Sequence, residues 1–344
     1  MKVGFFIENF NPSFGGPYTV VKETVEQLKK KNIQAIIIAK NNPLSVNKQS
    51  LIKEIKKLDI CHLYGGWTFF YLKAFVISYF LNKKIIFHPL GIFEPWAFNQ
   101  KKIKKKIAWF FYQNKILEKS NLVQCVSKIE EKNLLKLNKN LKTCVLSYGI
   151  SKNVIKKKIN QNNVKKKALF FSRIHPKKGL SELIKEWIFI GNPDWSLDIV
   201  GPCDDKDYYN SLLKLCSDSK NDKIRFLEPV YKKKDKNKLF DNYDLFILPT
   251  KNDPFGMVIL ESLSRGLPVL TNKNTPWIDI KNYNAGWYID LGSSYLRSEL
   301  IKIFKTRKNE FFTKSRNAIK LAKQFDWGII TEKYIQMYLN VLKS

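Results

Sequence analysis

Two carboxylates eight positions apart, in the run Asp253-Pro-Phe-Gly-Met-Val-Ile-Leu-Glu261, are the residues of this chain best suited to chemistry. Asp253 can cap a helix whose first turn contains Pro254, and Gly256 lets a ligand approach the backbone. The free N–H groups of that turn favour a phosphate or a sugar hydroxyl, and Glu261 can accept hydrogen bonds from a cis-diol such as ribose. The pattern indicates a nucleotide-sugar site; a capped surface helix is the alternative.

Two cations that could hold an anion lie in the run Phe171-Ser-Arg-Ile-His-Pro-Lys-Lys-Gly179, which follows an apolar strand pattern. Arg173 offers a planar donor group and Lys178 a point charge, a combination that suits the several oxygens of a pyrophosphate. Lysine is so common here that Lys178 alone carries no information, whereas Arg173 is one of six arginines. Together with the downstream run 253–261, the two residues predict a diphosphate site.

The N-terminal half offers weaker signals. Gly15-Gly16-Pro17 follows the first predicted strand, where glycine admits a ligand close to the backbone, but it is not a dinucleotide-binding G-x-G-x-x-G motif. His88 ends another predicted strand and can supply a polar group at the edge of the sheet; a structural histidine is the alternative. The three histidines lie far apart and Asp205-Lys-Asp207 stands in a polar loop, so no metal site is predicted.

Short apolar runs alternate with helical patterns in two successive series, separated by the polar segment 151–167. The predicted strands of the first series are 2–8, 33–39, 58–63, 84–88, 122–127 and 141–146, and those of the second are 168–172, 196–200, 224–227, 245–248, 268–271 and 286–289. This alternation predicts an α/β chain with two doubly wound, Rossmann-like domains. Open parallel sheets bind ligands beyond the carboxyl ends of their strands, so we expect a central cleft to hold the site.

Length and composition agree with this organisation. At 344 residues the chain is expected to form two domains. Its five cysteines include no C-x-x-C pair, so neither disulfides nor structural zinc are expected. No apolar stretch reaches about 18 residues and the N-terminus lacks the order of a secretory signal, which predicts a cytoplasmic protein.

The charge is strongly positive and unevenly distributed. Of the formal net charge of +31, residues 1–160 carry +20, from 29 Lys against 9 Asp and Glu, which predicts an anionic partner for this half. The run 101–112, where five lysines lead into aromatic residues, suits an anionic membrane surface on the inner face of the cell membrane. A buried helix and a compositional excess of lysine are the alternatives. Scarce arginine and the lack of an RNA or DNA motif argue against a nucleic-acid-binding protein, the rival of another class.

Taken together, these residues resemble the retaining glycosyltransferases of family 4, which have the two-domain GT-B fold. The E-x7-E element of that family falls on Asp253 and Glu261, with Phe255-Gly256-Met257-Val258 between them. Its diphosphate-binding Arg and Lys fall on Arg173 and Lys178. Asp253 stands where the family usually has Glu.

The resemblance covers nearly the whole chain and implies its organisation. An acceptor-side domain is expected at 1–152, a domain that binds the nucleotide sugar at 153–326, and a final helix at 327–344 that packs back on the N-terminal domain. Segments 62–65, 88–96, 275–277 and 286–287 resemble a branch that builds bacterial surface polysaccharides such as lipopolysaccharide. Tyr148 stands where the family usually has Asn.

The resemblance also implies an activity: retaining transfer of a hexose-like sugar from a nucleoside diphosphate sugar to a hydroxyl of a glycan or lipid-linked acceptor, without a metal or cofactor. Gly16 then joins residues 173, 178, 255–258 and 261 at the donor, and His88 and Asp253 line the reacting centre. A sugar-nucleotide epimerase, which shares this architecture, is the alternative enzyme, although the sequence offers no acid and base for it.

Overall fold

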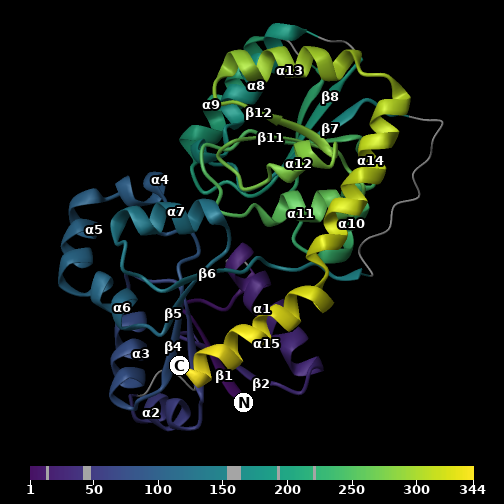
Figure 1. Ribbon diagram of the computed structural model, residues 1–344. Helices are drawn as coiled ribbons and strands as arrows, with labels where there is room; N and C mark the ends of the chain where they lie inside the picture. The colour runs from purple at the N-terminus through teal and green to yellow at the C-terminus, as the bar shows by residue number, and fades with distance from the viewer. Residues whose placement is uncertain (13–14, 42–47, 153–163, 192–193, 220–221) are drawn as a thin grey trace. The chain divides into compact units, whose positions relative to one another are not determined.

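The computed structural model describes residues 1–12, 15–41, 48–152, 164–191, 194–219 and 222–344. The chain forms two compact units (Figure 1): unit 1 comprises Met1–Gly149 and Trp327–Ser344, and unit 2 comprises Ile150–Asp326. Of the polar segment 151–167 that predicts a linker, residues 153–163 lie outside the described residues.

Unit 1 is built on a parallel sheet of six strands in the order β2-β1-β3-β4-β5-β6. The strands are β1 (Lys2–Ile7), β2 (Gln34–Ala39), β3 (Ile60–Tyr64), β4 (Lys84–His88), β5 (Leu122–Cys125) and β6 (Thr143–Val145). Every residue of β3 is buried, whichever face of the sheet it lies on. Helices cover both faces of such a sheet, which explains the continuous apolar runs of the sequence.

One face of this sheet packs on helices from the connections between its strands. Phe6, Leu63 and Phe87 share a core with residues of these helices. The connections from β2 to β6 contain α2 (Lys48–Lys56), α3 (Phe69–Phe80), α4 (Pro95–Asn99), α5 (Lys102–Ala108), η3 (Trp109–Gln113), α6 (Asn114–Lys119) and α7 (Lys128–Leu137). The pattern 103–119 predicts one helix, and the structure has an uninterrupted helical run there, in which the π-helical turn η3 lies between α5 and α6.

The other face of the sheet carries α1 (Gly16–Lys30) and α15 (Trp327–Lys343), which lie side by side (Figure 1). Tyr338 Oη lies 3.0 Å from His62 Nδ1, and Gln124 Nε2 donates a hydrogen bond to the Tyr334 hydroxyl at 2.9 Å. Because these aromatic residues of α15 are fully buried against the strands, the last helix is an integral part of unit 1.

Unit 2 holds a second parallel sheet of six strands, in the order β12-β11-β10-β7-β8-β9. The strands are β7 (Lys167–Phe171), β8 (Ser196–Val200), β9 (Ile224–Leu227), β10 (Leu245–Leu248), β11 (Val269–Asn272) and β12 (Gly286–Ile289). The helices are η5 (Pro176–Lys178), α8 (Leu180–Ile190), α9 (Lys206–Asp218), α10 (Lys233–Phe240), α11 (Met257–Ser264), α12 (Asp279–Asn282), α13 (Ser293–Lys305), α14 (Lys308–Ala322) and η6 (Lys323–Phe325).

The strand order of unit 2 reverses at the neighbouring strands β7 and β10, because β8 lies beyond β7 and β11 beyond β10. Crevices at such a switch point are where open α/β sheets bind their ligands. The two parallel sheets confirm the predicted α/β class with two domains. Among the described helices, none combines the length and the hydropathy needed to cross a bilayer.

Candidate functional site

The loops that follow β7 and β10 bring the two chemically informative runs together at the switch point of unit 2. The Lys251 N–H donates to the Lys177 carbonyl at 2.8 Å, and Thr250 Oγ1 donates to the same oxygen at 3.1 Å. Gly179 has a φ of +72°, and a Cβ added there would lie 2.1 Å from the Pro249 carbonyl oxygen. Only glycine allows this close approach, so the loops are locked to each other by their backbones.

Lys178 and Asp253, one from each loop, form an ion pair. Lys178 Nζ lies 2.7 Å from Asp253 Oδ2, and each side chain is 14% exposed. Burial by itself would raise the pKa of Asp253, but the charge and hydrogen bond of Lys178, with help from Lys177 and the Phe255 N–H, lower it below its usual value. Asp253 is therefore a carboxylate at neutral pH and is held by the cation predicted to bind a diphosphate.

The helix predicted to begin at Asp253 begins later. Gly256, with φ of +76°, occupies the N-cap position, and α11 starts at Met257. Asp253 is therefore not the N-cap. Its Oδ2 is engaged by Lys178, and its Oδ1 accepts from the Phe255 N–H at 3.3 Å. The Ile259 N–H donates to the Gly256 carbonyl at 2.8 Å, whereas no hydrogen bond joins the N–H groups of Met257 and Val258 to the described part of the chain. These two groups offer a partial positive charge at the start of α11.

Phe255 closes one side of this helix start. It is buried, its ring packs on Trp277 at 5.3 Å between centroids, and its carbonyl accepts a hydrogen bond from Trp277 Nε1. Met257 and Val258 remain half-buried at the start of α11. Trp277 thus fixes the turn that presents these backbone groups.

Glu261 pairs with a residue that sequence analysis missed. Lys236 Nζ, from α10, lies 2.5 Å from Glu261 Oε1, and the two side chains are 15% and 17% exposed. Lys236 stands in a polar run with four other lysines between residues 232 and 238, so no local signal distinguishes it. Only the proximity of α10 to α11 identifies it as part of the site.

Arg173 is exposed just beyond β7, and no hydrogen bond or ion pair joins it to the described part of the chain. The pKa of the neighbouring His175 is lowered, first by burial and then by the positive charges of Arg173, Lys177 and Lys178, against a smaller opposite effect of Asp205. These three cations therefore act on one small region. A field of this kind attracts an anion to the carboxyl end of β7.

His88, in unit 1, is fully buried. Its Nδ1 lies 2.7 Å from the Gln124 carbonyl, so Nδ1 carries a proton and Nε2 accepts from the Tyr148 hydroxyl at 2.5 Å. Burial lowers the pKa of His88 to about 4, although the bond to the Gln124 carbonyl acts in the opposite direction. The imidazole is therefore neutral at physiological pH. Its Nε2 is bonded to Tyr148, the residue that stands where the family usually has Asn.

Gly16, also in unit 1, is the first residue of α1 and is exposed. A Cβ placed there meets nothing within 4 Å among the described atoms. Packing within unit 1 therefore does not require glycine at this position. Among the residues described, no group of three or more His, Cys, Asp and Glu side chains could hold a metal ion.

The family described as Glycosyl transferases group 1 has a sequence model that matches residues 151–325. An uncharacterized 41.2 kDa protein of the cps region of Klebsiella pneumoniae is 24% identical over 325 residues, which cover 84% of this chain and 81% of that protein. The matched family segment contains both ion pairs of the switch point.

Two solved structures share the architecture. HepE of Anabaena, in complex with UDP and glucose, has a TM-score of 0.79 at 19% identity, over 98% of this chain and 99% of that chain. Sucrose-phosphate synthase of Thermosynechococcus elongatus has a TM-score of 0.81 at 14% identity, over 100% of this chain and 99% of that chain. At such identities the likeness shows the fold.

Proposed function

Because the chain belongs to the group 1 glycosyl transferases, we propose that it transfers a hexose-like sugar from a nucleoside diphosphate sugar to a hydroxyl of an acceptor sugar, with retention at the anomeric carbon. The observation that carries this proposal is the β7–β10 switch point, where Arg173, the Lys178–Asp253 pair and the start of α11 come together. We favour a UDP-sugar as donor, because HepE, which shares the fold, is in complex with UDP and glucose.

In the proposed reaction the bond between the anomeric carbon and the diphosphate oxygen breaks, and negative charge develops on the diphosphate. Arg173, Lys178 and the N–H groups of Met257 and Val258 at the start of α11 stabilise that charge. The acceptor oxygen bonds to the anomeric carbon on the same face of the sugar, and its proton passes to the departing phosphate oxygen. This scheme needs no separate base.

The two carboxylates have different tasks in this proposal. Asp253, next to the phosphate-binding Lys178, accepts hydrogen bonds from hydroxyls of the transferred sugar. Glu261, which the ion pair with Lys236 holds in place, accepts hydrogen bonds from the ribose. Residues 255–258 provide backbone contacts. In unit 1 we assign a donor contact to Gly16 and a role at the reacting centre, through its hydrogen bond with Tyr148, to His88.

We infer that the acceptor is a glycan or a lipid-linked sugar of a bacterial surface polysaccharide. The similarity to a protein of the cps region of Klebsiella pneumoniae supports this inference. A second support comes from the surface of unit 1, where large apolar side chains and lysines occur together.

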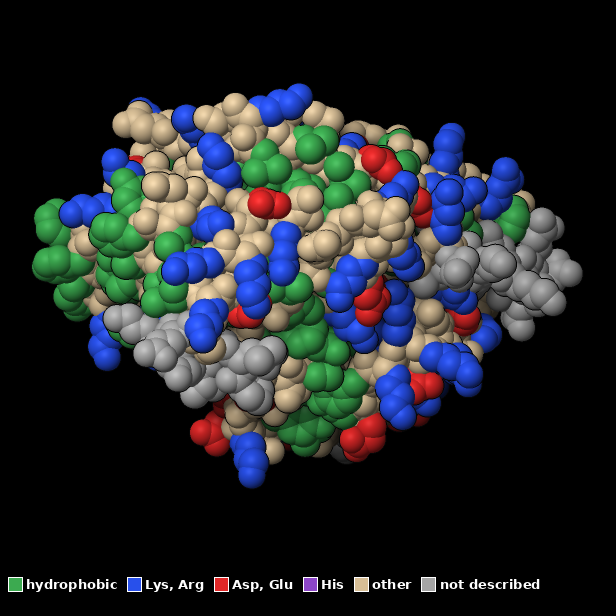
Figure 2. Space-filling view, turned by 90° about the horizontal axis from the view of Figure 1, so that it is seen from below, with side chains coloured by type: hydrophobic (Ala, Val, Ile, Leu, Met, Phe, Trp, Pro, Cys, Tyr) green, Lys and Arg blue, Asp and Glu red, His purple; other side chains and the backbone are tan. Residues whose placement is uncertain are grey.

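This surface, named here the aromatic face, consists of exposed residues of α3, α5 and η3. Its members are Phe69, Phe80, Ile103, Ile107, Phe110 and Phe111. Ile103 and Phe110 are each 77% exposed, whereas Trp109 and Tyr112 of the same run pack against the core. Figure 2 shows hydrophobic side chains gathered at the left edge, the side on which Figure 1 places α3 and α5, with basic side chains nearby.

Lys102, Lys104 and Lys106 are exposed on the same stretch, so the aromatic face has the composition of a surface that binds anionic lipid. Each lysine near such a surface contributes about 1 kcal/mol. We expect binding to vesicles that contain anionic lipid, falling with salt and with Lys102→Gln, Lys104→Gln and Lys106→Gln combined. The matched control changes Lys128, Lys132 and Lys136 of α7. Equal sedimentation with neutral vesicles would contradict the membrane role.

The transferase activity itself is tested by ligand binding and product analysis. UDP or GDP should raise the melting temperature, while a DNA or RNA oligonucleotide at physiological salt should not. A screen of sugar nucleotides for slow hydrolysis identifies the donor, and NMR of the transfer product reports the anomeric configuration. Conversion of the donor into an epimer without any acceptor would replace the proposal with the epimerase alternative, and inversion would disprove retention.

A further inference from the structure

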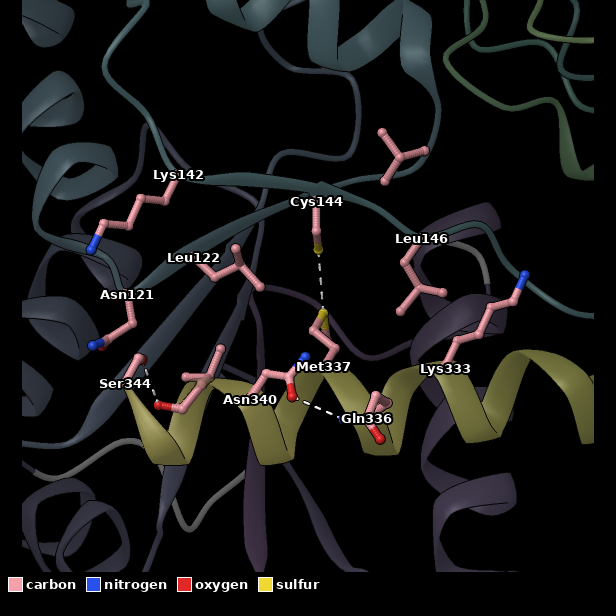
Figure 3. Close-up of a pocket in the computed structure, with 12 residues that line it drawn as sticks. Asn121, Leu122, Lys142, Cys144, Leu146, Lys333, Gln336, Met337, Asn340 and Ser344 are labelled. Carbon is pink, nitrogen blue, oxygen red and sulfur yellow. Dashed lines mark hydrogen bonds between the residues drawn. The ribbon is translucent and has the colours of Figure 1, made fainter.

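A groove of about 500 Å³ lies in unit 1 between β6, an edge strand of the sheet, and α15. Figure 3 shows Leu122, Cys144 and Leu146 on the sheet side and Met337 opposite them on the helix. Cys144 Sγ and Met337 Sδ are 3.6 Å apart. The volume lies in the range of about 300–1,000 Å³ that is usual for small-molecule sites.

The groove is elongated. Its wall on α15 runs from Lys333 to Val341, which are eight residues apart and span about 12 Å along the helix, and continues to Ser344 just beyond the helix end. The wall on the sheet follows the length of β6, from Lys142 to Leu146. This shape suits an extended chain better than a compact ring.

The interior of the groove is apolar. Burial, with a smaller contribution from the charge of Glu131, raises the pKa of the Cys144 thiol to about 12. Leu146, Met337 and Val341 complete an apolar lining. No Asp or Glu side chain belongs to the residues that line the groove. The amides of Asn121, Gln336 and Asn340 also line the groove, but most of its surface is apolar and favours a hydrocarbon chain over a polar ligand body.

Positive charge stands at both ends of the groove. Lys142 and Lys333 are exposed and lie at opposite ends of the lining in Figure 3. No ion pair joins either of them to the described part of the chain. An apolar channel with a free cation at each mouth complements a ligand that is apolar along its length and anionic at its end.

We propose that the groove binds a molecule with one flexible apolar chain and an anionic head group, such as an alkyl phosphate or a fatty acid. The chain lies between β6 and α15, and the head group pairs with Lys142 or Lys333. This site is separate from the switch point in unit 2. Its occupancy is measured without donor or acceptor, so its failure is distinguishable from failure of the transferase proposal.

The experiment measures binding of dodecyl phosphate, dodecanoate and dodecyl maltoside by calorimetry, below their micelle concentrations. We expect saturable binding of both anions at a stoichiometry of one and at least tenfold weaker binding of the neutral maltoside. Shortening the alkyl chain by two methylenes should weaken binding about tenfold. Tighter binding of the phosphate points to a single-chain lipid phosphate as the source, and tighter binding of the carboxylate to a fatty acid.

Variants place the ligand. Asn340→Trp, at an exposed residue of the wall, should block the groove and abolish binding while the melting temperature stays close to that of the unchanged protein; Gln336→Trp is the second blocking variant. Lys142→Gln with Lys333→Gln should weaken dodecyl phosphate at least tenfold. The matched control, Lys132→Gln with Lys343→Gln, removes the same charge outside the groove and should have no effect.

Phe110→Ser with Phe111→Ser tests whether the aromatic face captures the alkyl chain instead, and it should leave binding unchanged. The proposal is overturned by absence of saturable binding, or by unchanged binding in both folded Trp variants. Equal binding of phosphate and maltoside would also overturn it, because the lysines would then have no role.

Discussion

At the scale of single residues, Lys178 has two partners in the proposed reaction. It pairs with Asp253 at 2.7 Å, in a site where both side chains are 14% exposed, and it must also meet the donor diphosphate. A cation that contacts two anions fixes the distance between them. Lys178 would therefore fix the distance between the donor phosphate and the sugar hydroxyls bound by Asp253. Arg173 is exposed, so its side chain can move with the diphosphate as negative charge develops there.

Arg173→Ala should weaken UDP binding by about 1.5–3 kcal/mol, the usual contribution of a charge-assisted hydrogen bond. Calorimetric titration of UDP measures this change. Arg307→Ala, at an exposed arginine before α14, is the control and should leave the affinity unaltered. Retention of full UDP affinity by Arg173→Ala would remove this residue from the site.

The two carboxylates should separate in their mutant phenotypes. Glu261→Gln is expected to weaken free UDP as well as the sugar nucleotide, because ribose is common to both ligands. Asp253→Asn should mainly reduce kcat, because Asp253 acts on the transferred sugar. The measurement compares UDP affinity with steady-state transfer rates. Equal loss of UDP affinity in two folded variants would show that the tasks are not divided.

Glu130 gives a pH-dependent prediction for unit 1. Its two oxygens accept from the Gly91 N–H at 2.6 Å and from the Val126 N–H at 2.7 Å, which ties the loop after β4 to the end of β5. Burial raises its pKa to about 7; the two N–H groups act in the opposite direction, and Glu94 adds to the rise. The folded state thus holds the proton more tightly than the unfolded chain does.

This stability is fully present below the unfolded pKa of about 4.5 and is lost as the pH rises through about 7. Relative to Glu130→Gln, the unchanged protein should therefore lose up to about 3 kcal/mol of unfolding free energy between pH 5 and pH 8. Urea unfolding at several pH values measures the difference, with the exposed Glu26→Gln as control. A constant difference across this range would contradict the assigned pKa.

At the scale of elements, the site depends on the contact between the loops after β7 and β10. Gly179 permits that contact, because any Cβ would collide with the Pro249 carbonyl. Gly191, at the end of α8, has a similar positive φ of +60°, but the nearest atom to its Cβ position is 3.9 Å away. The two glycines therefore separate backbone strain from steric collision.

Gly191→Ala should cost about 1–2 kcal/mol, the strain of a left-handed alanine. Gly179→Ala should cost at least about 3 kcal/mol and also weaken UDP, since the loops must move apart. Thermal unfolding and UDP titration give the two quantities. Similar losses of stability in both variants, with UDP affinity preserved, would show that the loop contact does not support the site.

At the scale of the whole molecule, the cations of the chain bear on how the diphosphate charge is met. Arg173, Lys177 and Lys178 act on one region of unit 2, within a protein of formal net charge +31. Such a field repels a divalent cation and can replace its charge at a diphosphate. The same excess of lysine surrounds the apolar residues of unit 1 that we propose for lipid contact.

Transfer should accordingly survive an excess of EDTA. The assay follows release of UDP with and without the chelator, after identical desalting, and adds magnesium or manganese back in parallel. Loss of activity in EDTA that magnesium or manganese restores would overturn this expectation and require a metal at the diphosphate. An equal rate with and without EDTA or added metal would support Arg173 and Lys178 as the counter-ions of the diphosphate.

The fold class and the elements that carry the site can be predicted from the amino-acid sequence, because strand, turn and helix patterns are local. It placed Arg173 and Lys178 after one strand and Asp253 and Glu261 after another, and the structure puts those strands side by side. Helices, strands and turns depend mainly on residues that are close in the chain, so hydrophobic periodicity and turn residues suffice to predict them.

The side-chain pairs between residues far apart in the chain are visible only in the folded structure. Lys178 binds Asp253 over 75 residues, Lys236 binds Glu261 over 25, and Tyr148 binds His88 over 60. No local pattern distinguishes Lys236 from the many other lysines. The burial of His88 depends on Tyr148 and on the packing around β4. Ion pairing and burial arise from distances in space that periodicity does not encode, which is why the late start of α11 and the buried imidazole emerged only from the folded chain.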